Sequence, residues 1–131
     1  MKKLLILITL LTGIGSVANA FSPVQEAETK EHLEQSVLIV KLSQACKWDE
    51  RHDFLRGVMK VAYGVAGATS EFDKTSVDMW YQNADIEFDW NNPNSELMEV
   101  IKANPKAPDV IAYCQKLYDE GKGTIQKYAS Y

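Results

Sequence analysis

The sequence predicts an all-α protein, a small bundle of about five helices tied by one disulfide. In every long segment after residue 20, apolar residues recur at the spacing of an amphipathic helix. Helix-start and turn residues separate these segments, and no run of useful length has the alternation of a β-strand. Residues 21–131 are enough for one compact domain and too few for two.

Residues 1–20 have the pattern of a secretory signal peptide. Two lysines precede the apolar run 4–11, and the small residues of Ala18-Asn19-Ala20 suit a signal peptidase that cuts after Ala20. The apolar run is too short to span a bilayer. We therefore expect a cleaved chain that begins at Phe21 and resides in the periplasm, without a lipid anchor.

The predicted mature chain is acidic. The whole chain has a net charge of −4, and Lys2 and Lys3 lie in the predicted signal, which leaves −6 for residues 21–131. An acidic chain without a basic stripe is a poor match for nucleic acid or for anionic membranes. The composition therefore favours a protein partner, and it leaves a homodimer open.

Both cysteines, Cys46 and Cys114, lie in the predicted mature chain. Two cysteines in an oxidising compartment most simply form one disulfide. A metal pair or a reactive thiol is a weaker interpretation, because the two residues are far apart and no CxxC motif occurs. On the chain-entropy model the disulfide would stabilise the fold by roughly 4 kcal/mol.

Residues that typically begin or end helices indicate where the helices lie. Ser22-Pro23-Val24-Gln25 is a capping box with proline in the first turn. The expected helices are 23–47, 49–68, a third that begins at a cap at either Ser70 or Thr75 and extends to about residue 90, then 95–103 and 108–121. The last of them should end at Gly121 and Gly123, before a loose terminal turn. Gly57 and Gly64 lie inside the second helix, where we expect close approach to a neighbouring helix, and Gly67 either does the same or ends that helix. Asn91-Asn92-Pro93-Asn94 is the strongest turn signal.

Signatures of enzymes are missing from the sequence. It has no phosphate-binding glycine loop, no HExxH, no GxSxG and no haem-attachment motif. His32 and His52 stand among charged residues, and we expect both to face solvent. Met59, Met79 and Met98 have the spacing of core residues rather than of haem ligands. No nucleophile, base and orienting group can be assembled, so we expect neither catalysis nor a cofactor.

One pattern resembles a calcium loop. Acids at positions 85, 87, 89 and 96 match positions 1, 3, 5 and 12 of that loop. Trp90 stands where the loop needs glycine, and Asn92 stands where it needs an aliphatic residue. The sequence therefore favours a helix that simply extends to about Trp90, with its acids facing water and no metal site.

Charge is concentrated in one segment. Residues 71–99 contain eight acids and one base, a net charge of −7, with Trp80, Tyr81 and Trp90 among them. A local acidic field with aromatic anchors is suited to docking on a basic protein surface. The alternative is an ordinary solvated helix face with its aromatic residues turned inward.

Two stretches resemble the periplasmic acid-stress chaperones of the HdeA/HdeB type. Cys46 precedes an apolar helix that contains Val61-Ala62-Tyr63, and the late segment 108–116 reads Pro-Asp-Val-Ile-Ala-Tyr-Cys-Gln-Lys. The chain differs from that family in its longer first helix and longer acidic middle. The resemblance implies a small all-helical protein with one disulfide that prevents aggregation of unfolding proteins at low pH.

The resemblance also implies which residues act. In acid the net charge would move from −6 toward about +14, and self-repulsion would loosen the bundle while Cys46 and Cys114 hold it together. Loosened helices would expose apolar residues to clients. The client-binding residues expected on this basis are Phe54, Leu55, Val58, Val61, Val110, Ile111 and Leu117.

A second resemblance points to another class. Phe54-Leu55-Arg56-Gly57-Val58 and the segment 99–105 are similar to small helical periplasmic immunity proteins that neutralise type VI secretion toxins. Such a protein would bind one toxin at neutral pH through the acidic segment 71–99. The contact residues expected on this basis are Trp80, Tyr81, Asp85, Asp89 and Trp90.

Overall fold

The computed structural model describes residues 21–91 and 94–131, and these residues form five helices and no strand. The helices are α2 (Pro23–Ala45), α3 (Arg51–Ala66), α4 (Glu71–Asn91), α5 (Ser95–Ala103) and α6 (Pro108–Ala129). The predicted all-α bundle is confirmed. The predicted signal peptide and the middle of the predicted turn, Asn92-Pro93, lie outside the described residues.

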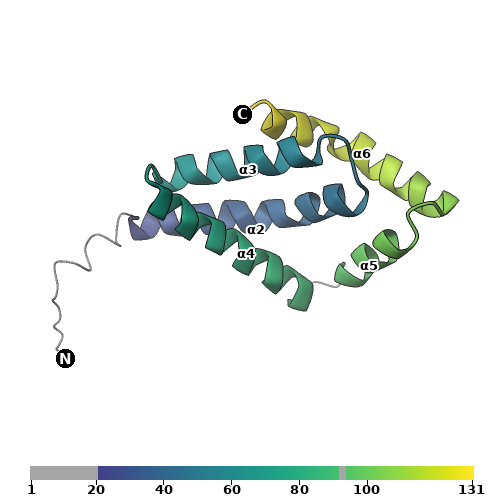
Figure 1. Ribbon diagram of the computed structural model, residues 1–131, viewed down its shortest axis with the longest axis horizontal. Coiled ribbons are helices and arrows are strands. Elements are labelled where there is room, and N and C mark those ends of the chain that lie inside the picture. The colour runs from purple at the N-terminus through teal and green to yellow at the C-terminus, as the bar shows by residue number, and fades with distance from the viewer. Residues whose placement is uncertain (1–20, 92–93) are drawn as a thin grey trace.

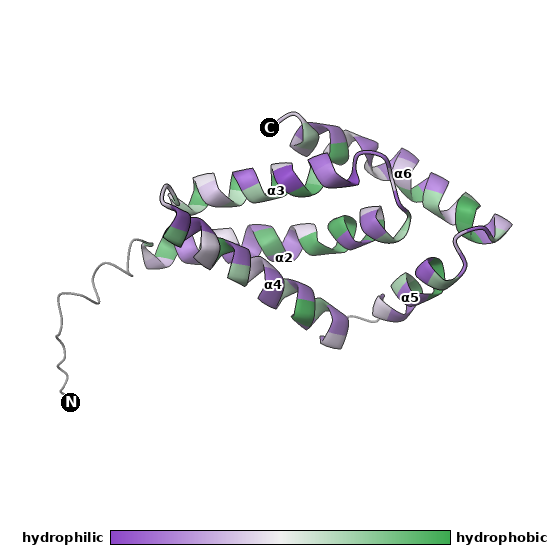
Figure 2. Cartoon of the chain, viewed as in Figure 1, coloured by the Kyte–Doolittle hydropathy of each residue, from purple (hydrophilic) through white to green (hydrophobic). Residues whose placement is uncertain are grey.

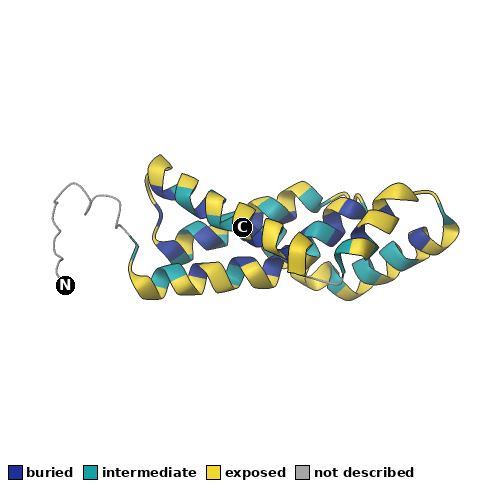
Figure 3. Ribbon diagram, turned by 90° about the horizontal axis from the view of Figure 1, so that it is seen from below, coloured by how far each residue is buried: buried dark blue, intermediate teal, exposed yellow. Residues whose placement is uncertain are grey.

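The central helix of the bundle is α2. It packs between α3 and α4, while α6 lies against α3, and α5 contacts α2 and α4 (Figure 1). Leu33 and Val40 of α2 and Phe54 of α3 are fully buried in the core that results. Buried residues lie where the helices face one another, and the outer faces are exposed (Figure 3). Among the described residues, no helix is both long and apolar enough to cross a membrane.

Two of the predicted helix ends are confirmed in atomic detail. The Ser22 hydroxyl accepts a hydrogen bond from the Gln25 backbone N–H at 3.1 Å, and the Gln25 side chain accepts one from the Ser22 N–H at 3.4 Å. This reciprocal pair satisfies two donors that the first turn leaves free. Gly67 ends α3 with a φ of 72°, a left-handed conformation that glycine adopts without steric cost.

The prediction that Gly121 and Gly123 end the last helix is wrong. Helix α6 continues through both glycines to Ala129, and this last part buries Ile125 completely. It also places the Tyr128 ring against Phe54, with the ring centroids 5.6 Å apart. Packing of these side chains offsets the roughly 1 kcal/mol that each glycine costs inside a helix.

Gly57 is the point of closest approach between α3 and α6. A Cβ atom there would lie 1.8 Å from the backbone carbonyl oxygen of Tyr128, so no side chain fits. The close approach predicted at Gly57 is therefore confirmed. The same prediction for Gly64 is wrong, because no atom of a neighbouring helix, among the described residues, lies within 4 Å of a Cβ built there.

Candidate functional site

Cys46 and Cys114 form the predicted disulfide, with Cα atoms 5.6 Å apart. The bond joins the C-terminal end of α2 to the second turn of α6. Between Cys46 and α3 the chain turns sharply, and Lys47 adopts a left-handed φ of 56°. This turn buries Trp48, whose ring meets the Tyr118 ring of α6 edge-on at 5.5 Å.

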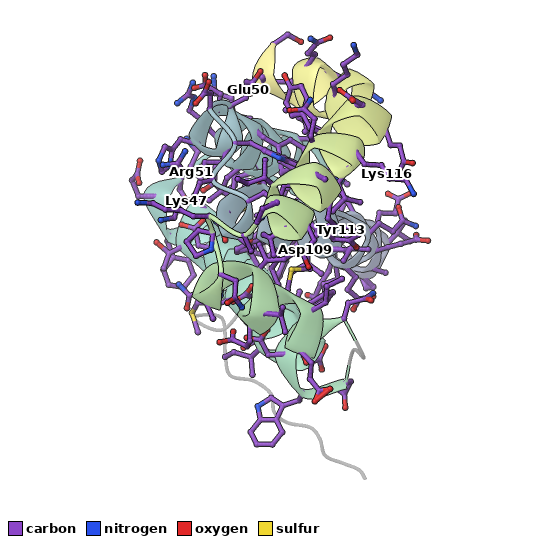
Figure 4. The ribbon with its side chains drawn as sticks, turned by 90° about the vertical axis from the view of Figure 1, so that its right-hand side faces the viewer. Lys47, Glu50, Arg51, Asp109, Tyr113 and Lys116 are labelled. Carbon is purple, nitrogen blue, oxygen red and sulfur yellow. A yellow bond between two sulfur atoms is a disulfide. The ribbon has the colours of Figure 1, made fainter. Side chains whose placement is uncertain are left out.

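A hollow of about 530 Å³ opens beside the disulfide. Its lining combines apolar and charged side chains from α5, α6 and the turn after α2: Trp48, Ile101, Val110, Ile111, Lys47, Asp49, Glu50, Tyr118 and the two cysteines among others. In Figure 4, which faces this end, Lys47, Glu50 and Arg51 lie on one side of α6, and Tyr113 and Lys116 lie on the other. The indole Nε1 of Trp48 is buried without a hydrogen-bond partner among the described residues.

The seven apolar residues proposed for client binding do not form one surface in the closed bundle. Phe54, Val58 and Val110 are buried, and the side chains of three others are half-buried. Ile111 differs from the other six, since 54% of it is already exposed, at the hollow, in the closed bundle. The half-buried residues are Leu55, Val61 and Leu117.

Lys41 of α2 holds the acidic helix α4. Its ammonium lies 2.7 Å from a carboxylate oxygen of Asp85 and 2.9 Å from one of Asp89. Burial alone would lower the pKa of Lys41, but the hydrogen bonds and charges of the two carboxylates outweigh burial and raise that pKa above its ordinary value. The Lys41 side chain is only 11% exposed, so this is a largely buried cation with two counter-charges.

The five residues proposed as toxin contacts separate into inner and outer positions. Asp85 and Asp89 face Lys41, and Trp80 is half-buried against Phe21 with ring centroids 4.8 Å apart. Tyr81 is also half-buried, and burial together with the charge of Asp85 raises its pKa. Trp90 differs from the other four, because 83% of it is exposed at the end of α4.

Two tyrosines make further links between helices through carboxylates. The Tyr63 hydroxyl of α3 donates to Asp78 of α4 at 2.5 Å, and the Tyr118 hydroxyl of α6 donates to Glu50 at 2.6 Å. The hydrogen bond to Glu50, with burial and nearby acids, raises the pKa of Tyr118. The prediction that His32 faces solvent is wrong, since its half-buried ring Nε2 lies 3.0 Å from the Val58 carbonyl oxygen. His52 is exposed as predicted.

Tyr63→Phe should make the protein less sensitive to alkali. Burial, the hydrogen bond to Asp78 and nearby acidic charge raise the pKa of Tyr63 from 10.0 to about 12. Between these values the folded chain keeps a proton that the unfolded chain has lost, so stability falls as the pH rises from 10 to 12. At pH 8 the variant should be less stable by about 1 kcal/mol, because it lacks the hydrogen bond to Asp78. Between pH 8 and 11 its free energy of unfolding should fall less than that of the unchanged protein.

Urea midpoints at the two pH values would measure both effects. The remaining alkaline decline of the variant would come from Lys41, Tyr81 and Tyr118, whose pKa values are also raised. An equal decline in both proteins would contradict a role for the Tyr63 hydroxyl.

Several of these contacts were missed in the sequence. Lys41 follows Val37 and Val40 on the apolar face of its helix, and a lysine among core positions was the signal that it needs counter-charges. The outer apolar residues Phe72, Met79 and Ile86 recur every seven positions, and this spacing was the signal for an apolar stripe along one side of the helix.

Residues 21–91 and 94–131 contain no group of three or more His, Cys, Asp and Glu side chains placed to hold a metal ion. Asp85, Glu87 and Asp89 of the calcium-like pattern lie in the regular helix α4, which ends at Asn91. Neither a protein-family model, nor a curated protein, nor a solved structure matches this chain.

Proposed function

We propose that this protein is a periplasmic holding chaperone that opens in acid and binds unfolding proteins through apolar surfaces covered at neutral pH. One observation carries the proposal. Among the described residues, each hydrogen bond or ion pair that links a side chain of α4 to α2 or α3 ends on Asp78, Asp85 or Asp89. Acid therefore acts on the attachment of one helix in particular.

Lys41 makes that attachment sensitive to acid. Around pH 2–3 most carboxylates in proteins take up protons. Protonation of Asp85 and Asp89 would leave the Lys41 ammonium largely buried without its counter-charges, which is strongly unfavourable. The Phe88 ring, 5.6 Å from the Lys41 nitrogen, supplies a weaker cation–π contact that is unaffected by pH. Movement of α4 away from α2 would return Lys41 to water.

The rest of the bundle is less dependent on carboxylates, because α6, whose Tyr118 donates a hydrogen bond to Glu50, is also held by the disulfide. His32 of α2 contacts a backbone carbonyl of α3, and its imidazole can donate this bond in either protonation state. The disulfide ties α6 to the end of α2. Acid opening would therefore move α4 and uncover the α2 surface that it shields, around Val37, along with Val77 and Phe88 on its own inner face.

Lys41→Met should shift acid opening to lower pH. Methionine keeps the length and apolar packing of the lysine stem, and no buried ammonium is stranded when the aspartates are protonated. Binding of a hydrophobic dye during acid titration would report exposure of the core. Lys102→Met is the matched control, because Lys102 is exposed and its ion pair with Glu99 lies within α5. An unchanged midpoint in Lys41→Met would contradict the mechanism.

The function itself is tested by aggregation of an acid-labile protein at pH 2–3. The chaperone would be expressed with residues 1–20, so that export and disulfide formation can take place, and then purified in the oxidised form. We expect suppression of light scattering in acid, none at pH 7, and weaker suppression after reduction. Equal scattering with and without the protein in acid would refute the proposal.

A further inference from the structure

Helix α4 presents an exposed apolar stripe to solvent. Its members Phe72, Met79, Ile86 and Trp90 are 62, 57, 53 and 83% exposed, and they are four of the nine large apolar side chains exposed among the described residues. The spacings of seven, seven and four residues place all four on one side of a helix with 3.6 residues per turn. The opposite side of α4 packs on the bundle through Val77, Ala84 and Phe88.

The stripe itself carries no charge. The positions interspersed on the same side, Thr75, Ser76 and Asn83, are polar and neutral, although α4 as a whole contains six acids and one base. In Figure 2 the helix is largely hydrophilic and is interrupted by hydrophobic residues. An uncharged line along so acidic a helix is the pattern of a helix that fits an apolar groove, with anchors at successive turns.

Acids border the stripe on both sides. On a regular helix Glu87 falls along one edge, and Glu71 and Asp89 fall along the other. Asp89 is ion-paired with Lys41, while neither Glu71 nor Glu87 is in an ion pair with another described residue. The border therefore supplies uncompensated negative charge to whatever covers the stripe.

The negative charge at the border determines which kinds of partner could cover the stripe. A second copy of the chain, stripe against stripe, would bring two helices of six acids and one base into contact, and like charges at short range repel. Anionic lipid is disfavoured for the same reason. A protein with an apolar groove edged by lysine and arginine would complement both the stripe and its borders.

We propose that the outer face of α4 is a docking surface, at neutral pH, for a partner protein that presents an apolar groove or helix face bordered by basic residues. Phe72, Met79, Ile86 and Trp90 are the anchors, and Glu71 and Glu87 give electrostatic steering. The surface is available while the inner side of α4 stays packed, so it is independent of acid opening.

A pair of designed helical peptides tests the surface. Both have 21 residues with leucine at heptad core positions, one with lysine and one with glutamate at the flanking positions. At pH 7 the fluorescein-labelled lysine peptide should bind the oxidised protein, and the glutamate peptide should not. Met79→Ser/Ile86→Ser should weaken binding by about tenfold or more, because it removes two anchors without changing charge. Glu71→Lys/Glu87→Lys should also weaken it.

Val24→Ser/Val100→Ser is the matched control, since these residues are 66 and 52% exposed and lie outside α4. It should leave binding unchanged. Lys41→Met, which frees Asp89 at the border, should not weaken binding, and this separates the surface from acid opening. Thermal melting of each variant verifies folding. Equal binding by the Met79→Ser/Ile86→Ser variant would overturn the proposal. The proposal would also be overturned if the unchanged protein formed a dimer in sedimentation, or bound anionic vesicles, and the Met79→Ser/Ile86→Ser variant did not.

Discussion

Gly57→Ala should destabilise the protein by about 3 kcal/mol, although alanine normally stabilises a helix. The new Cβ would lie 1.8 Å from the carbonyl oxygen and 2.5 Å from the carbonyl carbon of Tyr128. Both are backbone atoms, so no side-chain rotation relieves the overlap and α6 must move outward. That movement would also separate the Tyr128 ring from Phe54 and His32, its neighbours at 5.6 and 5.7 Å.

Gly64→Ala is the matched control in the same helix. A Cβ there meets no described atom of another helix within 4 Å, so alanine should raise the free energy of unfolding by about 1 kcal/mol. Urea denaturation of both variants at pH 7 measures the difference. The two variants should move in opposite directions, and stabilisation by both would mean that α3 and α6 are not in contact at this point.

Replacing both cysteines, by Cys46→Ser/Cys114→Ser, should lower the free energy of unfolding by about 4 kcal/mol. The two residues are 68 positions apart, and the disulfide restricts the unfolded chain over that whole loop. A single domain is typically stable by only about 5–15 kcal/mol, so the serine variant would be marginal. In the folded state the start of α6 would lose its covalent attachment to α2.

Denaturant unfolding of the oxidised protein, the reduced protein and the serine variant measures this contribution. The reduced protein and the serine variant should agree, and a reductant should not change the serine variant. A loss below about 1 kcal/mol would mean that the unfolded chain is already restricted without the bond, against the chain-entropy account.

Helix starts could be predicted because their signals lie within a few neighbouring residues. The disulfide could be predicted because so few cysteine pairings are possible. The capping box at Ser22 is readable within four residues, and two cysteines allow a single intramolecular pairing. The end of α6 could not be predicted in this way. Gly121 and Gly123 have the local character of a helix stop, but Ile125 and Tyr128 find partners on α3, and packing outweighs local propensity.

The candidate surfaces were only partly predictable. The charge of segment 71–99 is visible in the sequence, but the pairing of Asp85 and Asp89 with Lys41 depends on α2 and α4 being neighbours. The exposure of Ile111 likewise depends on how α6 packs. Helix α6 contacts mainly α3, and this packing leaves Ile111 beside the hollow. Helical periodicity separates the two sides of a helix, but it does not show which side is covered.

The disulfide also determines how the molecule would respond to mechanical force. When the chain is pulled at residues 21 and 131, tension passes directly from Cys46 to Cys114, and the 67 residues between them, 47–113, bear no load. The fully stretched chain would be shorter by about 230 Å than a chain without the bond. Helices α3, α4 and α5 lie within this unloaded loop, so a partner held on the outer face of α4 would be shielded from pulling at the two ends.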